Sequence, residues 1–383
     1  MRILIAVATW IAQGIYAVLK ALFPARRKAV FLSRQSDEPS RDFILLAEEL
    51  RRRDPDLEIV TRCRMVGRSA MGRLAAIAPT IGQMYHLATS RVCIIDGYVI
   101  PVSLLTHHPG LYVVQLWHAL GAVKRFGYQT LDRPGGHSSS LATAMRMHRN
   151  YDVVVCAGRA TVPVFAEAFG VDPSIVRPTG LPRMDYLRAH AGDARVTPAP
   201  PVVAALRRRF PVLDDRDRTV VLYAPTFRRG GGERYRDVAE RFSGERYAVI
   251  IKPHPLEAAR VEGSGVVNAG DADILDLLPL CDLVITDYSA VAFEASVLDL
   301  PVYFWVYDID EYRAAHGLNL DPLTEMPQAS SRDLEALAGR IEAGDTHPEV
   351  TRMLKERYVS EADGRCTERI AALVLDSLNT ART

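Results

Sequence analysis

Two histidines in this sequence follow apolar runs that predict buried strands, and each stands close to a lysine. His118 lies in WHALGAVKRFG, six residues before Lys124, and His254 lies in IIKPHP, two residues after Lys252. A histidine at the carboxyl end of a strand can act as a general base, and the prolines on both sides of His254 hold it rigidly for contact with an anion. The pattern predicts that His118 is a general base and that His254, Lys124 and Lys252 contact an anionic substrate.

The stretch DLVITDYSAVAFEASVLDLPVYF places polar residues between a predicted strand, 283–286, and a predicted helix. The helix starts around Ser289 and Ala290, where backbone N–H groups and the serine hydroxyl suit the oxygens of a phosphate. Asp287 would repel a phosphate unless a metal intervened, so we expect it to cap the helix or to organise the turn. The sequence therefore predicts a diphosphate site at Ser289 and Ala290.

Two further motifs carry a weaker signal. In PTGLPRMDYL, Arg183 follows a tight turn, and both a substrate contact and an ordinary exposed arginine remain open. In YAPTFRRGGGERYR, Thr226 and Arg228 end a predicted strand, and the three glycines after them either cradle a phosphate or form a mobile loop. The glycines are not followed by Lys-Ser or Lys-Thr, so the motif is not a P-loop. We include Arg183, Thr226 and Arg228 among the predicted substrate contacts.

The composition sets the frame for these motifs. The chain has 383 residues, 48% of them hydrophobic, which is enough for two domains. Its 47 basic and 46 acidic residues leave a formal charge of +1, so no global field marks it as a nucleic-acid binder. The five cysteines are odd in number, widely spaced and mostly set in apolar runs, which indicates packing residues in a reducing compartment.

Short apolar runs alternate with amphipathic helical patterns along most of the chain. Near-continuous Val, Ile and Leu runs of this kind are typical of parallel strands covered by helices on both faces. The predicted strands lie within 28–34, 57–62, 91–97, 111–118, 151–158, 219–226, 247–255, 264–270, 282–287 and 300–306. A Pro-rich linker at 195–203 separates the two halves. We therefore predict an α/β fold of two doubly wound, Rossmann-like domains facing a cleft, 25–200 and 201–383, with ligands outside the carboxyl ends of the strands.

The first 24 residues differ from the rest. Between Ile3 and Phe23 the only charge is Lys20, and Thr9, Gln13, Tyr16 and Lys20 form one polar stripe at helical spacing. A basic run, 26–28, follows, and no small-x-small cleavage site is evident. We predict that residues 1–24 form a membrane-associating helix that lies in the interface, with the basic run on anionic headgroups, while a spanning helix and a buried helix remain alternatives.

Six motifs taken together resemble the CDP-glycerol glycerophosphotransferase family of teichoic-acid synthesis. The motifs are WHALGAVKRFG, TGLPRMDYL, VLYAPTFR, IIKPHP, CDLVITDYSAVAFEASVLDLPVYFWVYDIDEY and DGRCTERI, and they occur in the family's order over about residues 90–375. The resemblance implies a glycosyltransferase-B-like fold. It also implies transfer of glycerol phosphate from CDP-glycerol to a hydroxyl of a polyprenyl-diphosphate-linked saccharide acceptor, with release of CMP, at the cytoplasmic face of the membrane.

The resemblance also assigns roles to residues. It carries the catalytic pair to His118 and His254 and the donor-diphosphate contact to Ser289, whereas Ala290 replaces the family's usual second serine. It further places Asp271 and Asp273 near the donor. The arginine near the family's C-terminal Asp-Gly motif matches Arg365.

One departure from the family pattern bears on the subclass. Polymerase-type members tend to read Trp-His-Gly-Thr-Pro-Leu-Lys, and this sequence has one more residue before Lys124. That form and the chain length resemble the shorter, primase-like members, although a sequence alone does not fix the acceptor. CDP-ribitol as donor, a sugar-nucleotide glycosyltransferase and a non-catalytic membrane-bound scaffold remain alternatives.

The mechanism that we expect needs neither a cofactor nor a metal ion. His118 accepts the proton of the acceptor hydroxyl, which attacks the phosphorus in line with the departing CMP. Lys252, the helix start at Ser289 and, if it is protonated, His254 stabilise the charge that builds on the phosphoryl oxygens.

Overall fold

The computed structural model describes residues 2–65, 77–136, 138–191, 201–228, 232–254, 257 and 260–380. Contacts between residues divide the chain into two compact units. The N-terminal unit comprises Met1–Ala119, Phe126–Arg183 and Arg365–Thr383, and the C-terminal unit comprises Leu120–Arg125 and Met184–Gly364. The predicted cysteine role is confirmed, since all five cysteines are free and four are buried.

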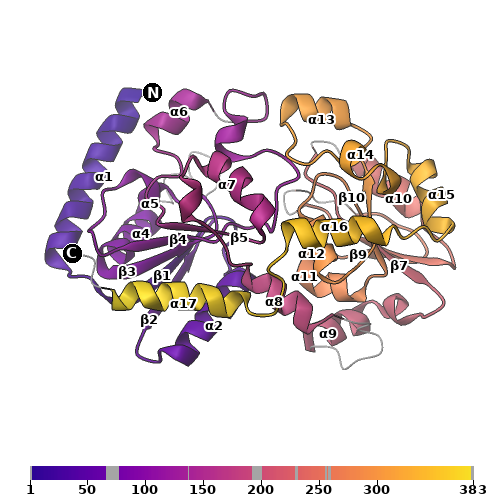
Figure 1. The fold of residues 1–383 in the computed structure, drawn as a ribbon, viewed down its shortest axis with the longest axis horizontal. Coiled ribbons are helices and arrows are strands. Elements are labelled where there is room, and N and C mark those ends of the chain that lie inside the picture. The colour runs from indigo at the N-terminus through magenta and orange to yellow at the C-terminus, as the bar shows by residue number, and fades with distance from the viewer. Residues whose placement is uncertain are drawn as a thin grey trace. The chain divides into compact units, whose positions relative to one another are not determined.

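A six-stranded parallel sheet forms the centre of the N-terminal unit, in the order β2-β1-β3-β4-β5-β6 (Figure 1). The central strands are buried on both faces, as their Val- and Ile-rich runs predict. The strands are β1 Arg26–Ser33, β2 Glu58–Cys63, β3 Ser90–Ile95, β4 Tyr112–Gln115, β5 Val153–Cys156 and β6 Val176–Pro178. The helices are α1 Arg2–Leu22, α2 Arg41–Arg53, α4 Ile77–Thr89, α5 Ile100–Leu104, α6 Ser139–Ala144, α7 Val162–Phe169 and α17 Cys366–Asn379, with 3₁₀ turns η1 Gly127–Thr130, η2 Arg159–Thr161 and η3 Pro173–Ile175.

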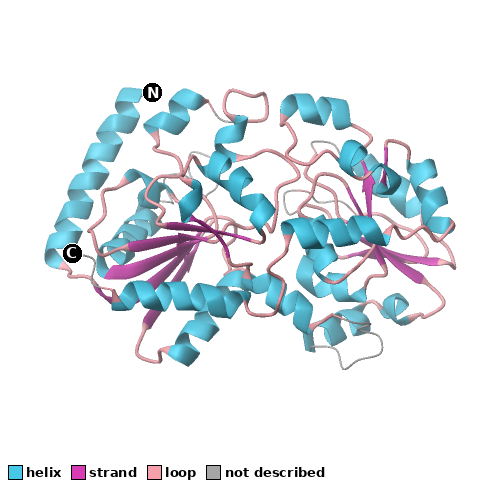
Figure 2. Ribbon diagram, in the orientation of Figure 1, coloured by secondary structure: helices cyan, strands magenta, loops and turns pink. Residues whose placement is uncertain are grey.

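The C-terminal unit repeats this plan with a second six-stranded parallel sheet, in the order β12-β11-β10-β7-β8-β9. Figure 2 shows strands in magenta and helices in cyan in both units. Its strands are β7 Thr219–Tyr223, β8 Tyr247–Ile251, β9 Val266–Asn268, β10 Leu283–Thr286, β11 Val302–Trp305 and β12 Ser330–Ser331. Its helices are α9 Pro201–Arg209, α10 Gly232–Arg241, α11 Ile274–Leu277, α12 Val291–Val297, α13 Ile309–Ala315, α14 Pro322–Glu325, α15 Leu334–Glu342 and α16 Pro348–Tyr358, with 3₁₀ turns η4 Pro211–Asp214, η5 Leu278–Leu280 and η6 Pro327–Ala329. Helix α8, Pro182–Ala189, contains the boundary between the units. The predicted pair of doubly wound α/β domains is therefore confirmed.

The units divide the chain at places other than the predicted boundary at residue 200. The last helix, α17, belongs to the N-terminal unit because it packs against α2 and β3. The first unit also ends at Arg183, ahead of the Pro-rich segment, and most of that segment, 192–200, lies outside the described residues. A split by composition alone misses a chain that returns to its first unit.

Helix α1 turns its polar stripe toward the N-terminal unit. Tyr16 is fully buried, and its hydroxyl lies 2.8 Å from Nδ1 of His107. Lys20 donates to the carbonyl of Thr106, and Gln13 accepts the Thr106 N–H. The exposed face of α1 carries large apolar residues such as Trp10 and Val18, so the helix is amphipathic with its polar stripe inward.

Residues Leu120–Arg125 are fastened to the C-terminal unit by backbone hydrogen bonds. The carbonyl of Val123 accepts from the N–H groups of Asn319 and Leu320, at 2.8 and 3.2 Å. Lys124 pairs with Leu318 in an antiparallel bridge, which fixes the backbone of the predicted lysine. Gly121 packs so closely on the fully buried ring of Phe293 that an added Cβ would lie 2.5 Å from it.

Gly121→Ala should therefore destabilise the protein by about 1–3 kcal/mol, because the added methyl overpacks a closed core. Gly339→Ala is the matched control: Gly339 lies within α15 with nothing within 4 Å of an added Cβ, and alanine there should stabilise the helix by up to about 1 kcal/mol. Denaturant unfolding of the two variants measures both effects. Equal stability of Gly121→Ala and the parent protein would show that the Phe293 ring turns aside at no cost.

Candidate active site

His118 lies just beyond the carboxyl end of β4, and a backbone carbonyl orients its ring. Nδ1 of His118 is 3.1 Å from the carbonyl oxygen of Asp96, the residue that follows β3. A carbonyl only accepts, so this bond makes Nδ1 the donor and gives Nε2 the lone pair. The imidazole is thus held as the tautomer that a general base requires.

The residue before this histidine has a strained backbone. Trp117 adopts φ 61°, a left-handed conformation that side-chain-bearing residues rarely take, and its N–H donates to Oε1 of Gln115 at 2.9 Å. Its ring stacks on Phe126, with centroids 4.8 Å apart, and meets the edge of Phe169. Strain of this kind costs about 1–3 kcal/mol and persists only where packing over-determines it. The aromatic packing therefore helps to set where His118 points.

Arg183 is engaged inside the N-terminal unit. Its guanidinium forms a two-pronged ion pair with the buried carboxylate of Asp42, at 2.5 and 2.8 Å, and also donates to the carbonyl of His118 at 3.0 Å. The carboxylate of Asp42 also accepts the backbone N–H of Arg183 at 2.7 Å. The predicted substrate contact thus lies at the backbone of the predicted base.

A buried carboxylate connects the loops that follow the carboxyl ends of β7 and β10 in the C-terminal unit. Asp287 accepts the N–H and the hydroxyl of Thr226, both at 2.8 Å, and the N–H of Tyr288 at 2.5 Å. Burial raises the pKa of Asp287, and the nearby charge of Arg228 acts in the other direction. Thr226 and Asp287, predicted from separate motifs, are therefore brought into contact.

Arg228 lies at the centre of the same cluster. Its guanidinium bonds to Asp308 at 2.7 Å and to Asp287 at 3.1 Å, and it covers the ring of Tyr312 at 4.3 Å. Tyr312 in turn stacks on Tyr288, with centroids 4.0 Å apart. Burial alone would lower the pKa of Arg228, but Asp308 and Asp287 raise it above its ordinary value. Arg228 thus holds the turn after β10 in place, and the charges of Arg228 and Asp287 also act on Lys124.

Lys252 and His254, two further residues predicted to contact the substrate, follow the carboxyl end of β8. Lys252 donates to the carbonyl of Gly270 at 2.8 Å, and the ring of His254 lies beside Phe227. Loss of solvent and the charges of Lys124 and Lys252 lower the pKa of His254, so its neutral form is favoured. The lowered pKa therefore does not favour the protonated form in which His254 would add a positive charge.

Four predicted residues have local contacts of their own. Ser289 accepts the N–H of Val291 at 3.4 Å, and Ala290 makes no side-chain cap to α12. Asp273 caps α11, and the exposed Asp271 pairs with Arg209 at 2.7 Å.

Arg365 belongs to the N-terminal unit, with a side chain that is 69% exposed and pairs with Glu368 at 2.8 Å. The structure thus groups it with the unit of His118 and apart from the predicted donor residues of the C-terminal unit. Arg229, Gly230, Gly231 and Pro255 lie outside the described residues.

Several residues of these clusters were not predicted. Asp308 lies three residues after the end of β11, so inspection of the residues after every predicted strand would have found it. Asp42 and Tyr312 lie within helices, where only the fold shows what they approach. Among the described residues, no group of three or more His, Cys, Asp and Glu side chains is placed to hold a metal ion.

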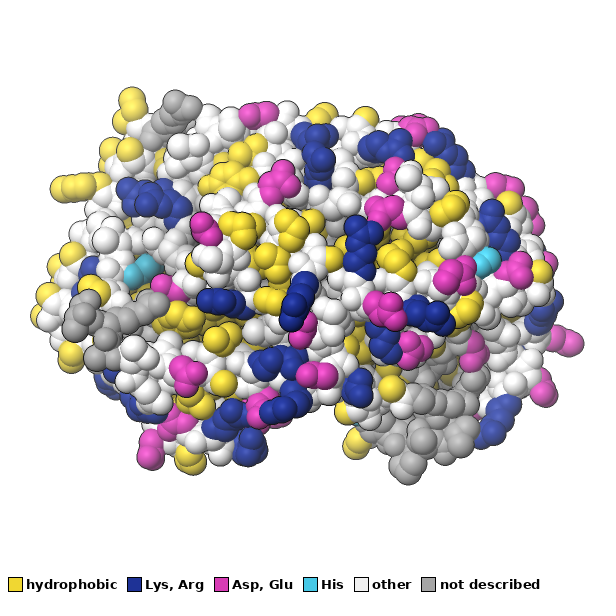
Figure 3. Space-filling view, in the orientation of Figure 1, with side chains coloured by type: hydrophobic (Ala, Val, Ile, Leu, Met, Phe, Trp, Pro, Cys, Tyr) yellow, Lys and Arg dark blue, Asp and Glu magenta, His cyan; other side chains and the backbone are white. Residues whose placement is uncertain are grey.

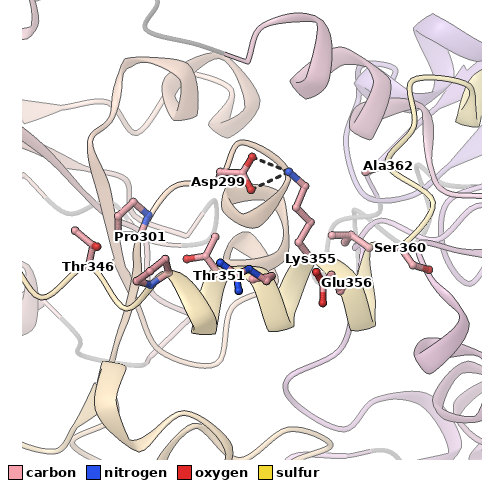
Figure 4. Close-up of a pocket in the computed structure, with 11 residues that line it drawn as sticks. Asp299, Pro301, Thr346, Thr351, Lys355, Glu356, Ser360 and Ala362 are labelled. Atoms are coloured by element: carbon pink, nitrogen blue, oxygen red, sulfur yellow. Dashed lines mark hydrogen bonds and ion pairs between the residues drawn. The ribbon is translucent and has the colours of Figure 1, made fainter.

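A pocket of about 720 Å³ lies near the amino end of β11, and Asp299 and Pro301, which precede this strand, line it (Figure 4). Residues of α16 also line the pocket, and Lys355 reaches from α16 to pair with Asp299 at 2.7 Å. None of the predicted site residues lines this pocket. The predicted residues of the C-terminal unit lie instead at the carboxyl ends of its strands.

The profile of the CDP-glycerol:poly(glycerophosphate) glycerophosphotransferase family matches residues 15–376. The chain belongs to this family. It is 31% identical to the teichoic acid ribitol-phosphate primase of Bacillus spizizenii over 97% of this chain and 98% of that protein. It is 24% identical to the teichoic acid glycerol-phosphate primase of Bacillus subtilis over 76% of this chain and 74% of that protein.

A solved structure supports the family's fold. The wall teichoic acid polymerase TagF superposes with a TM-score of 0.74 at 18% identity, over 99% of this chain and 98% of that one. The glycosyltransferase-B-like architecture is therefore confirmed, and the chain is a teichoic-acid phosphotransferase by family.

Arg183→Leu should cost about 3–5 kcal/mol of stability, because it leaves the Asp42 carboxylate buried without its cation. The double variant Asp42→Asn/Arg183→Leu should regain most of that loss. The asparagine is neutral, and its side-chain oxygen can still accept the backbone N–H of position 183. Turnover should stay low in both variants because the carbonyl of His118 has lost its donor. Thermal unfolding and turnover separate the two effects, and activity that returns together with stability would reduce Arg183 to a structural role.

Proposed function

We propose that the protein transfers a polyol phosphate, with ribitol phosphate as the first choice, from its CDP ester to a hydroxyl of a polyprenyl-diphosphate-linked acceptor. The observation that carries this proposal is the fixed tautomer of His118 in a member of this family. Ribitol is placed before glycerol because the likeness to a ribitol-phosphate primase extends over nearly the whole of both chains. CDP-glycerol is the second candidate, favoured by the family's own description.

The base of the proposed reaction is His118, a residue of the N-terminal unit. Nε2 of His118 accepts the proton of the acceptor hydroxyl as the hydroxyl oxygen attacks the phosphorus that bears the polyol in the CDP ester. The bond from that phosphorus to the CMP oxygen breaks, the new phosphodiester forms, and CMP leaves with the electron pair. The proton on His118 is then released to solvent.

The donor contacts come from the C-terminal unit. Lys124, Lys252 and Ser289 are proposed to bind the diphosphate, and Asp287 and Arg228 are proposed to hold the loops that present them. His254 contributes a neutral N–H donor to the phosphoryl oxygens, in keeping with its lowered pKa. We propose that these donors suffice without a metal ion or a cofactor.

Product analysis with purified protein tests the reaction. CDP-ribitol, CDP-glycerol and a UDP-sugar are each incubated with lipid-linked acceptors, and the released nucleotide and the lipid product are measured by mass. Release of CMP with CDP-ribitol as the preferred donor is expected, before and after dialysis against EDTA. Release of a nucleoside diphosphate would indicate a glycosyltransferase, and faster transfer from CDP-glycerol would reverse the order of donors. Activity that is lost on dialysis and restored by magnesium would contradict metal independence.

His118→Ala should lower turnover by about 10²–10⁴-fold and leave donor affinity largely unchanged, because a general base acts in the transition state. Calorimetric titration with the donor and a rate measurement on the same preparation check this. A loss of donor affinity as large as the loss of rate would show that His118 binds the donor instead.

We further propose that α1 attaches the protein to the cytoplasmic face of the membrane by lying in the interface. Within the described residues one helix, at Ile5–Leu22, is long and apolar enough to cross a membrane by length and composition. Its polar stripe is bound to the N-terminal unit, and a spanning helix would have to break those bonds. The exposed apolar side chains project along α1 (Figure 3), and they are Ile3, Val7, Trp10, Ile11, Ile15, Val18 and Leu22.

The basic run after α1 contributes less to this attachment than the sequence suggests. Arg26 pairs with Glu58, Arg27 pairs with Asp54, and Lys28 is fully buried within β1. Two of the three charges are already paired, and the third does not reach the surface. The apolar face of α1 is therefore the main proposed contact with lipid.

Trp10→Asp/Val18→Asp places two charges on the exposed face of α1, where the parent side chains are 78% and 56% exposed. Flotation with vesicles that contain phosphatidylglycerol should show most of the parent protein bound and most of the variant free, because a charge at an apolar interface is costly. Val202→Asp, on an exposed apolar residue of α9, is the control and should float like the parent. Equal flotation of all three proteins would remove α1 as the anchor.

A further inference from the structure

A buried carboxyl group lies next to His118 and has no part in the mechanism given so far. Asp96 follows β3, and its side chain is 2% exposed. Oδ1 of Asp96 has no hydrogen-bond partner within the part of the chain that the structure describes. Burying an unpaired carboxyl oxygen is costly, so a group of this kind calls for a physical explanation.

The position of Asp96 relative to His118 supplies a physical explanation for the buried carboxyl. The backbone carbonyl of Asp96 is the group that accepts the Nδ1–H of His118, at 3.1 Å. The carboxyl group belongs to the same residue, so it lies no further from this hydrogen bond than the length of one aspartate side chain. The carboxyl is buried and the His118 ring is exposed, and a charge that is partly surrounded by protein is screened less than one in water.

The groups that face Asp96 come from each neighbouring element. The Ser33 hydroxyl at the end of β1 hydrogen-bonds to the carboxyl, and Cys63 at the end of β2 lies within reach of its charge. The carboxylate of Asp42 and the guanidinium of Arg183 act in opposite directions and are paired with each other. Burial, with a smaller contribution from Asp42, raises the pKa of Asp96 to about 7.

We propose that Asp96 is a positioning residue for the base, whose carboxylate stabilises the imidazolium that forms when His118 takes the proton of the acceptor hydroxyl. The inference rests on the proposed role of His118 as the base. Asp96 touches neither substrate nor the reacting atoms, since its carboxyl is buried. It acts through the charge that it places beside the imidazole.

The arrangement couples the two titrations. As the pH rises through neutrality, Asp96 loses its proton and the negative charge strengthens the neighbouring base. Protonation of His118 in turn favours the ionised form of Asp96, because the two charges attract. The acid limb of the rate profile then belongs to the pair and not to either residue alone.

Histidine titration by NMR on the full chain tests the inference, with the signal of His118 assigned from His118→Gln. In Asp96→Asn the midpoint of the His118 titration should move down by about 0.5–1 pH unit, because a neighbouring negative charge is lost. The tautomer should be unchanged, since the backbone carbonyl of Asp96 remains. Turnover should fall by about tenfold or more while donor affinity holds.

Asp152→Asn is the matched control. Asp152 lies at the amino end of β5 in the same sheet, whereas His118 follows the carboxyl end of β4. The carboxylate of Asp152 accepts the N–H of Val113 at 2.7 Å, a bond that asparagine can keep. This variant should leave the His118 titration unchanged. Should Asp96→Asn fail to fold, Ser33→Ala provides a second variant. It removes a bond that favours the ionised carboxyl and should move the His118 midpoint in the same direction by a smaller amount.

An unchanged His118 midpoint in a folded Asp96→Asn protein overturns the inference. A changed tautomer also overturns it, because Asp96 would then only shape the loop. Full turnover in His118→Gln is a different failure: it removes the base assignment, whatever the titration of Asp96→Asn shows.

Discussion

A carboxylate taken out of water must find cations or N–H donors, and in this protein two buried aspartates meet that requirement at the edges where chemistry is proposed. Asp287 takes donors from the end of β7 and from its own turn, so the loops after two adjacent strands become one rigid body. Asp42 takes the guanidinium of Arg183, which also reaches the backbone of His118. Breaking such a pair leaves an uncompensated buried charge, which costs several kcal/mol. The positions of the proposed base and of the proposed phosphate contacts therefore depend on pairs that never touch a substrate.

The strand ends could be predicted from the sequence because parallel sheets make them simple. Long Val, Ile and Leu runs indicate buried strands, and the carboxyl ends of parallel strands share one edge of the sheet. Thr226 and Asp287 were therefore singled out separately, each because it follows a predicted strand. Strands β6 and β12, Val-Arg-Pro and Ser-Ser, have no apolar run and were missed. The roles of Arg183 and Arg228 could not be predicted, because their partners are distant in sequence. Asp42 is 141 residues from Arg183, and Asp308 is 80 residues from Arg228.

The first helix shows a different limit of prediction. Its polar stripe was read from spacing, but spacing does not say which side of a helix meets the protein. Only the contacts of Tyr16 and Lys20 with the segment after α5 show that the polar side is the inner one. The same contacts distinguish a helix that lies along the unit from one that leaves it, a choice that hydropathy alone left open.

The short segment Leu120–Arg125 has a consequence for exchanging parts between relatives. Its glycine fits against one ring, Phe293, and its backbone is bonded to residues 317–320, far along the chain. A change in the length of the motif that contains His118 would place another residue against this ring. A chimaera that receives the motif from a relative would have to receive position 293 and the 317–320 turn with it. Sequence changes in these three places are therefore expected to be correlated, although the first lies far along the chain from the other two.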